Sequence, residues 1–206
     1  MNMCPLRLLA AGVLVALPTT LTDGGECPRS EYARTLLEAG GRTGIELKAA
    51  ADLGHPEAFR VGREDGRTQI EAATPAGWIY GAQTVVRDDA RAGRVEQPDF
   101  DIRGATLWIA GEVSGRRIAA YHSEFNAERF PWFFDRRFMT RYLDALAAAR
   151  YNTLFLWASH PFPYILELPE YPGATGLTDA QLRQNQDQFR WLAEQCQRRL
   201  RRNPTR

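Results

Sequence analysis

Arginine, tryptophan and histidine residues flank two short apolar segments of this 206-residue chain, and their side chains are of the types that bind sugars. Arg103 and Trp108 belong to the first segment, whereas Trp157 lies at the end of the second and His160 follows it. Aromatic faces match the apolar C–H face of a sugar ring, and arginine or histidine can hydrogen-bond its hydroxyl groups. We therefore predict that these four residues bind substrate.

Each of these four residues also has a structural alternative. Arg103 could pair with a carboxylate that lines the fold, and His160 could be a loop histidine that is hydrogen-bonded to backbone. Trp108 and Trp157 could pack in the core, where large aromatic side chains contribute much of the buried apolar area. The sequence leaves these alternatives open.

Glycoside hydrolysis needs two carboxyl groups that flank the scissile bond, or one carboxyl group and a substrate acetamido group. The acidic residues nearest the candidate loops show no paired placement and are expected at the surface: Glu112, Glu124, Glu167 and Asp179. No catalytic residue is therefore assigned. The sequence also lacks a phosphate-binding glycine loop, metal-ligand spacing and a nucleophile elbow, so neither cofactor nor metal is predicted.

Two strand-then-helix units must position these side chains. Residues 102–110 and 152–158 are short and rich in apolar, aromatic and β-branched residues, which predicts buried parallel strands. Helices are predicted after both, one with Asp135 as a possible cap and the other with Thr178 and Gln181 as a capping box. Their predicted buried faces consist of Phe138, Tyr142, Leu146 and Ala149 in the first helix, and of Leu182, Phe189, Leu192 and Cys196 in the second.

The first half of the chain has a different pattern. A helix is predicted over residues 32–39, followed by extended segments at 45–49, 58–62 and 68–72, the last two joined by a turn at Glu64-Asp65-Gly66. A helix over residues 75–92 and a linker over 95–99 complete the pattern. Residues 28–95 are therefore predicted to form a small α+β domain.

Composition narrows the class of protein. The chain is 44% hydrophobic and 25% charged with a net charge of +1, so no electrostatic feature points to nucleic acid. The arginines between residues 198 and 206 are interpreted as a solvated helix end. Of the three cysteines, Cys27 and Cys196 would remain after cleavage of an amino-terminal signal peptide, too few for a disulfide framework. The oligomeric state is not predicted.

The amino terminus resembles a secretory signal peptide. Arg7 precedes an apolar run from Leu8 to Leu17, which Pro18 ends. This run is shorter than the roughly 20 residues that span a bilayer, so no stable membrane insertion is expected. Residues 1–22 are predicted to be a signal peptide that directs export to the periplasm or the extracellular space.

Three motifs together resemble a known group of enzymes: Gly77-Trp78-Ile79-Tyr80-Gly81 after the predicted hairpin, Asp101-Ile102-Arg103-Gly104, and Tyr151 to Trp157. Their order is similar to the small α+β domain and barrel start of family 20 β-hexosaminidases, α-glucuronidases and their relatives. The resemblance implies that Arg103 binds hydroxyls of the terminal sugar and that the catalytic carboxylates come from the fourth barrel strand and beyond. Hexosaminidases have an aspartate near the position of Trp108, so an α-glucuronidase-like or uncharacterised relative fits at least as well.

The predicted fold is a small α+β sandwich domain (28–95) followed by the first two β/α units of a truncated (β/α)8 barrel (99–206). A complete barrel takes about 250 residues, so the chain is expected to be inactive alone. The predicted function is that of the N-terminal fragment of an exported glycoside hydrolase, with carbohydrate as its partner. Two alternatives stay open: a non-catalytic carbohydrate-binding or interaction module, and a truncated product without function. An open sheet would also expose Phe155, Trp157 and Leu107, a predicted aggregation surface.

Overall fold

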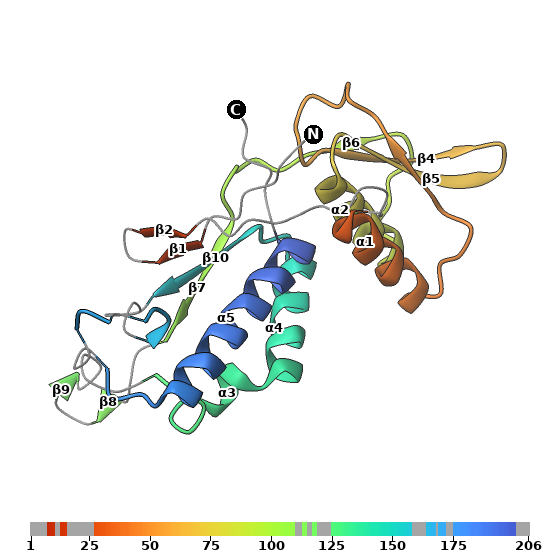
Figure 1. Cartoon of the computed structure of the whole chain (residues 1–206). Helices are drawn as coiled ribbons and strands as arrows, with labels where there is room; N and C mark the ends of the chain where they lie inside the picture. Colours follow the sequence, from red (N-terminus) through yellow and green to blue (C-terminus); the bar gives the residue numbers. More distant parts are fainter. Residues whose placement is uncertain are drawn as a thin grey trace.

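The chain folds into two units, each of which has a small sheet with helices packed on it (Figure 1). The computed structural model describes residues 8–10, 13–15, 27–109, 113–114, 117–118, 125–157, 164–167, 169–171 and 175–200. Mixed α and β structure is therefore confirmed, and the described residues include both of the predicted β/α units. Closure of these units into a barrel stays a prediction.

The amino-terminal unit is a four-stranded sheet in the order β3-β5-β4-β6, with two helices on one side (Figure 1). Strand β3 is parallel to β5, and the other neighbours are antiparallel. Its core combines apolar residues of the strands with Ile79, Tyr80 and Ala82 of the second helix. In chain order its elements are α1 (Pro28–Ala39), β3 (Glu46–Ala49), β4 (Phe59–Glu64), β5 (Arg67–Ala72), α2 (Pro75–Val86) and β6 (Val95–Glu96).

The predicted hairpin is confirmed, because β4 and β5 pair from Phe59↔Ala72 to Glu64↔Arg67. Asp65 and Gly66 both have positive φ angles, 50° and 78°, as the tight turns favoured between antiparallel strands require. The predicted end of the following helix is wrong. Helix α2 stops at Val86, since the chain takes a positive φ of 58° at Asp88.

The predicted linker is also partly wrong. Its first two residues form strand β6, which adds antiparallel to β4 and extends the sheet.

The second unit contains two parallel strands, each followed by helix. Residues 104–108 pair in register with residues 153–157, which confirms both predicted strands with shorter bounds. Helices α4 and α5 lie side by side along one face of this sheet (Figure 1). The elements are β7 (Gly104–Trp108), β8 (Val113–Ser114), β9 (Arg117–Ile118), α3 (Pro131–Phe134), α4 (Arg136–Ala148), β10 (Thr153–Trp157) and α5 (Asp179–Arg199).

The predicted helix starts are confirmed. One predicted buried face is partly wrong, since Tyr142 and Leu146 of α4 pack against the core but are only half-buried. Thr178 and Gln181 form the full capping box of α5, and the Asp135 side chain accepts from the amides of Arg137 and Phe138. In α4 the buried side chains are Met139, Leu143 and Ala147, and Phe138 is 40% exposed. The buried face is therefore turned by one residue from the prediction, because both sets have helical spacing and tertiary packing decides between them.

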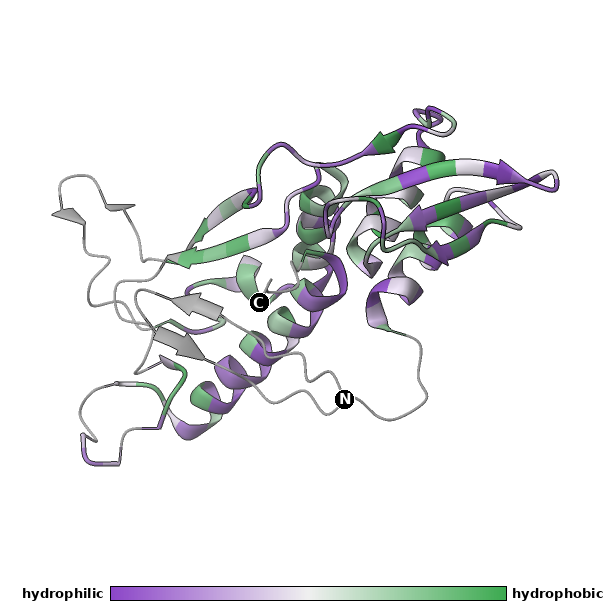
Figure 2. Cartoon of the chain, turned by 90° about the horizontal axis from the view of Figure 1, so that it is seen from above, coloured by the Kyte–Doolittle hydropathy of each residue, from purple (hydrophilic) through white to green (hydrophobic). Residues whose placement is uncertain are grey.

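The two faces of the β7–β10 sheet have different surroundings. Leu107 pairs with Leu156, and both pack into the core on the face that α4 and α5 cover. Phe155 pairs with Thr106 on the opposite face, because successive side chains of a strand alternate between faces. Leu107 was therefore wrongly predicted to be part of the exposed apolar surface. Figure 2 shows hydrophobic residues, coloured green, along this pair of strands.

Two short strands lie within the predicted signal peptide. Strands β1 (Leu8–Ala10) and β2 (Val13–Val15) form an antiparallel pair, and β1 lies parallel to β10 at the Ala10↔Leu156 pair. The rest of residues 1–26 lies outside the described residues, so the signal peptide stays a prediction.

Substitution of Gly77 should reveal how closely α2 lies on its sheet. An added Cβ would lie 2.5 Å from the Ala58 carbonyl oxygen and 2.7 Å from the Ala72 Cβ. The steric overlap should cost about 1–3 kcal/mol. Alanine favours helix over glycine by roughly 1 kcal/mol, which offsets part of this cost, and we expect Gly77→Ala to lower the free energy of unfolding overall. Urea unfolding measures this change. Gly62→Ala, which would meet no atom within 4 Å, should cause little change, and an equal loss in both variants would contradict the prediction.

Candidate functional site

The predicted sugar-binding residues lie at opposite ends of the β7–β10 sheet. Trp108 and Trp157 are the last residues of β7 and β10 and occupy partnered positions in the register. The carboxyl ends of parallel strands are where (β/α)8 enzymes place their active sites, so the backbone brings these two residues to a suitable position. Their side chains and all of His160 lie outside the described residues, and their sugar contacts stay predictions.

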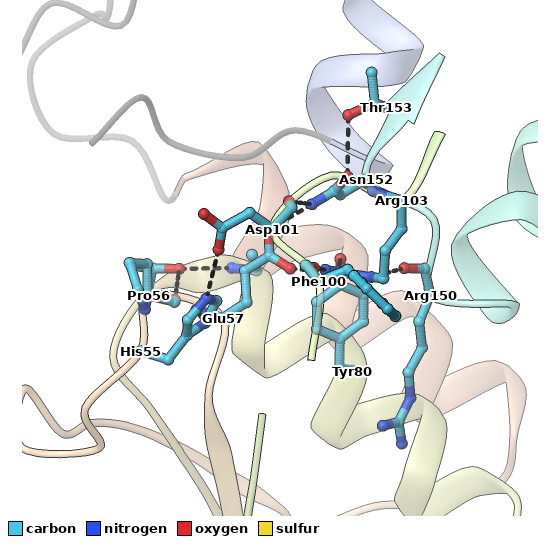
Figure 3. Close-up of polar contacts among 12 residues, drawn as sticks. His55, Pro56, Glu57, Tyr80, Phe100, Asp101, Arg103, Arg150, Asn152 and Thr153 are labelled. Atoms are coloured by element: carbon cyan, nitrogen blue, oxygen red, sulfur yellow. Dashed lines mark hydrogen bonds and ion pairs between the residues drawn. The ribbon is translucent and has the colours of Figure 1, made fainter. Parts of the chain in front are cut away.

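Arg103, by contrast, lies immediately before Gly104 at the amino end of β7. Its guanidinium group enters the junction between the two units, where Figure 3 shows it among side chains from both. It is ion-paired with Glu57 and donates to the Tyr80 hydroxyl at 3.1 Å. It also donates to the carbonyl oxygens of Arg150 at 2.7 Å and Phe100 at 2.6 Å. Four hydrogen bonds within the chain thus hold this guanidinium group. They match the structural alternative, in which Arg103 pairs with a carboxylate of the fold. Sugar binding by Arg103 stays a prediction.

Asn152 completes the polar core of this junction (Figure 3). Its side-chain amide donates to Glu57 Oε1 at 2.9 Å and to the Asp101 carbonyl at 2.8 Å. Its side-chain oxygen accepts from the Arg103 backbone amide at 3.0 Å. Glu57 is only 2% exposed. Both of its carboxylate oxygens accept hydrogen bonds from the second unit, one from Arg103 and the other from Asn152. This pattern meets the requirement that a buried charge be paired and hydrogen-bonded.

The junction alters the protonation of its members. Burial, followed by the nearby charge of Glu57, raises the pKa of Tyr80 to about 12, so its hydroxyl stays protonated and can donate. Burial acts to lower the pKa of Arg103, but the hydrogen bond to Glu57 and the charges of Tyr80 and Glu57 raise it overall. At neutral pH the site therefore holds a charged arginine and a neutral tyrosine.

Arg150 forms a second contact between the units. It follows helix α4 with a positive φ of 61°, a conformation in which glycine is the usual residue. Its guanidinium group pairs with Glu96 at 3.2 Å, donates to Thr84 at 2.9 Å and lies 5.4 Å from the centre of the Phe59 ring. All three partners belong to the amino-terminal unit, so the side chain helps to hold the backbone in this unusual conformation.

A third contact joins three helices. The Tyr32 hydroxyl of α1 donates to Asp144 of α4 at 2.8 Å, and Arg199 of α5 donates to the same carboxylate oxygen at 2.7 Å. Arg199 also lies 4.8 Å from the centre of the Tyr32 ring and is only 8% exposed. Burial and the hydrogen bond to Asp144 raise the pKa of Tyr32 above its usual range, so its hydroxyl is a donor at neutral pH.

A polar pocket of about 690 Å³ opens beside Arg150. Its volume is within the range of small-ligand sites, but its lining is mostly charged or polar rather than apolar. With arginine and carboxylate groups in equal number, such a lining suits a hydroxyl-rich compound. The charged or polar lining residues are Thr84, Asp89, Arg91, Arg94, Glu96, Gln97, Asp99 and Arg150.

Other chemistry has little support in the described part of the chain. Glu167 and Asp179 are exposed, as predicted, whereas Glu112 and Glu124 lie outside the described residues. Within the described ranges no three His, Cys, Asp or Glu side chains gather as a metal site would require. Nor is any helix in those ranges both long and apolar enough to cross a membrane. Burial raises the pKa of Cys196 to about 12, so its thiol stays protonated.

Sequence reasoning missed Glu57, Tyr80 and Asn152. Asn152 had a usable signal, because it lies between a helix end and an apolar strand, where an amide can serve two backbone segments. Glu57 had none, since its partner Arg103 is 46 residues away and acidic residues in loops are usually solvated.

Removal of the Glu57 charge should weaken the junction strongly. Glu57→Gln would turn an N–H group toward either Arg103 or Asn152, both of which are donors. We expect the free energy of unfolding to fall by about 3 kcal/mol. This is the low end for a broken buried ion pair, because 19% of the Arg103 side chain is exposed. Chemical denaturation followed by circular dichroism measures it. Lys48→Met, which removes the exposed Lys48–Glu64 pair, should leave stability almost unchanged; a similar small effect for Glu57→Gln would show that the junction pair is not stabilising.

Comparison with known proteins gives a match only at the level of structure. No family model matches the chain, and no curated protein matches it by sequence. A glycoside hydrolase family 138 enzyme, described as targeting the pectin rhamnogalacturonan II, has a similar fold over 84% of this chain. The two are 24% identical with a TM-score of 0.68, and the match covers 22% of that enzyme.

Two Streptomyces enzymes of the predicted group are also matched. The family 20 β-N-acetylhexosaminidase of Streptomyces coelicolor is 21% identical, with 75% of this chain and 32% of that one covered and a TM-score of 0.42. The N-acetyl-β-hexosaminidase of Streptomyces plicatus is 21% identical, with 95% and 42% covered and a TM-score of 0.44. At such TM-scores these two matches carry no argument here. The chain thus shares the fold of part of a glycoside hydrolase and spans about a fifth of the length of the family 138 enzyme.

Proposed function

We propose that this chain is the N-terminal part of an exported glycoside hydrolase that acts on carbohydrate. The observation that carries the proposal is the similarity to the family 138 enzyme, which extends over both units at a TM-score of 0.68. Export is proposed from the sequence of residues 1–22 alone. We further propose that the two β/α units are the start of a (β/α)8 barrel, on which the amino-terminal unit is fixed by the Glu57–Arg103 pair.

The sugar-binding position proposed here is the carboxyl end of β7 and β10. Trp108 and Trp157 have partnered places there, where the loops of a barrel enzyme would hold substrate. A carbohydrate of the pectin type is a reasonable first ligand, because the family 138 enzyme is described as targeting pectin rhamnogalacturonan II. The hydrolytic step itself is proposed to need carboxyl groups beyond those described, since Glu167 and Asp179 are exposed and unpaired with each other.

A second candidate function is that of a carbohydrate-binding module without catalysis. The polar pocket beside Arg150 favours it, because most of its lining comes from the amino-terminal unit and its neighbouring linker. Arg91 and Arg94 in that lining could hold hydroxyl or carboxylate groups of a sugar. Under this alternative, Arg94→Ala would abolish carbohydrate binding, whereas Trp157→Ala would not.

The purified chain should not hydrolyse glycosides by itself. We expect aryl-glycosides, pectin fragments and chitin oligosaccharides to show no product above the buffer control, because the paired carboxyl groups of a glycosidase are lacking in the described site. Chromophore release and chromatography of the sugars measure this. Hydrolysis that follows the protein through successive purification steps would overturn the expectation.

Trp157 should contribute to carbohydrate binding if the proposed site is correct. We expect Trp157→Ala to raise the Kd for pectin-derived oligosaccharides about tenfold or more, which corresponds to about 1.4 kcal/mol of lost aromatic contact. Isothermal titration calorimetry on the whole chain measures it. Trp78→Ala is the matched control, because Trp78 lies in the amino-terminal unit and donates to the Lys48 carbonyl at 3.0 Å. Equal affinities for Trp157→Ala and the unmodified chain would contradict this site.

A further inference from the structure

Helix α5 carries three amide side chains whose hydrogen bonds lie outside the helix itself. Asn185, Gln186 and Gln188 all donate to backbone carbonyl oxygens of other segments. Asn185 and Gln188 are 0% and 3% exposed, so they lie within the buried stripe that also contains Phe189 and Leu192. A buried amide in an apolar stripe costs stability unless its groups are hydrogen-bonded, so its partners indicate what it is there to hold.

Asn185 donates to two segments at once, whereas Gln186 and Gln188 each donate to one. Its Nδ2 group donates to the Phe125 carbonyl at 2.6 Å and to the Tyr164 carbonyl at 2.9 Å. Phe125 lies in the connection that follows β7, and Tyr164 lies in the connection that follows β10. One buried side chain therefore joins the two connections that leave the carboxyl ends of the parallel strands.

Each connection has further contacts in the described part of the chain, and the Phe125 ring also lies 5.7 Å from the Phe189 ring of α5. The Phe125 ring packs against Phe130 and Phe133, with centroid distances of 4.8 and 5.0 Å. Ile165, next to Tyr164, receives a bond of 2.9 Å from Gln186. Asn185 Oδ1 has no hydrogen-bond partner in the described part of the chain, so the two donated bonds are what this side chain contributes there.

We propose that Asn185 is a positioning residue that couples the two connections and thereby fixes the spacing of the residues at the carboxyl ends of β7 and β10. Part of this proposal rests on the proposed function, because the sugar would bind between those ends. The coupling itself does not depend on it. A displacement of 1 Å at a binding site is costly, so a single buried bridge between two loops is an effective way to set their separation.

Amide hydrogen exchange of the whole chain tests the coupling without any ligand. In Asn185→Leu both carbonyl groups lose their donor, and we expect exchange in residues 125–130 and 164–167 to rise together by about tenfold, the effect of about 1.4 kcal/mol. Gln188→Met is the matched control from the same buried stripe. It removes the bond of 2.6 Å to the Phe133 carbonyl and the bond of 3.2 Å accepted from Arg136, neither of which reaches residues 125–130 or 164–167. Faster exchange in neither segment, in only one of them, or equally in Gln188→Met would overturn the proposal.

A second variant covers the case in which Asn185→Leu does not fold. Asn185→Ser keeps a single short donor, so we expect the same joint rise in exchange to a smaller extent, and unchanged exchange would overturn the coupling. Oligosaccharide affinity then separates the two proposals. If the unmodified chain binds pectin oligosaccharides, Asn185→Leu should weaken binding about tenfold while Gln188→Met does not; if the chain binds none, the proposed function fails and the exchange result still decides the coupling.

Discussion

The fold depends first on the buried ion pair between Glu57 and Arg103. Glu57 belongs to the amino-terminal unit, Arg103 begins the first β/α unit, and Asn152 joins them from the start of the second. Because the Glu57 carboxylate, which is 2% exposed, takes its donors from the other two segments, removal of either donor would leave a buried charge incompletely paired. The contacts through Arg150 and through Asp144 also join the two units and stabilise the same relative position.

The two ends of the β7–β10 sheet have different surroundings. The amino end is filled by Arg103, Asn152 and their partners, and its polar groups are used within the chain. The carboxyl end carries Trp108 and Trp157 and the connections that Asn185 holds. The proposed binding position matches the division seen in (β/α)8 enzymes, where loops at the carboxyl ends of the strands bind substrate and the opposite ends maintain stability.

Local features of the fold could be predicted from the sequence because they depend on neighbouring residues. The turn at Asp65-Gly66 and the capping box of Thr178 and Gln181 are examples, as both need only residues within a few positions. The buried face of α4 could not be predicted, because Phe138 and Met139 begin equally regular apolar stripes and only packing against the sheet chooses between them. The end of α2 was missed for a similar reason, since strand β6 forms with a partner 37 residues earlier, Phe59↔Glu96.

In the candidate site, too, the contacts that depend on distant residues could not be predicted from the sequence. The sequence singled out Arg103 but left open whether its partner is a sugar or a carboxylate. The structure pairs it with Glu57, 46 residues away in the chain, and sugar binding by Arg103 stays a prediction. Asn185 carried a local signal that was not used: an amide three residues after Leu182 and four before Phe189 occupies a position of the buried stripe. Polar residues at apolar positions of a predicted helix are therefore worth examining as anchors for loops, because burial of an amide is tolerated only where its hydrogen bonds are made.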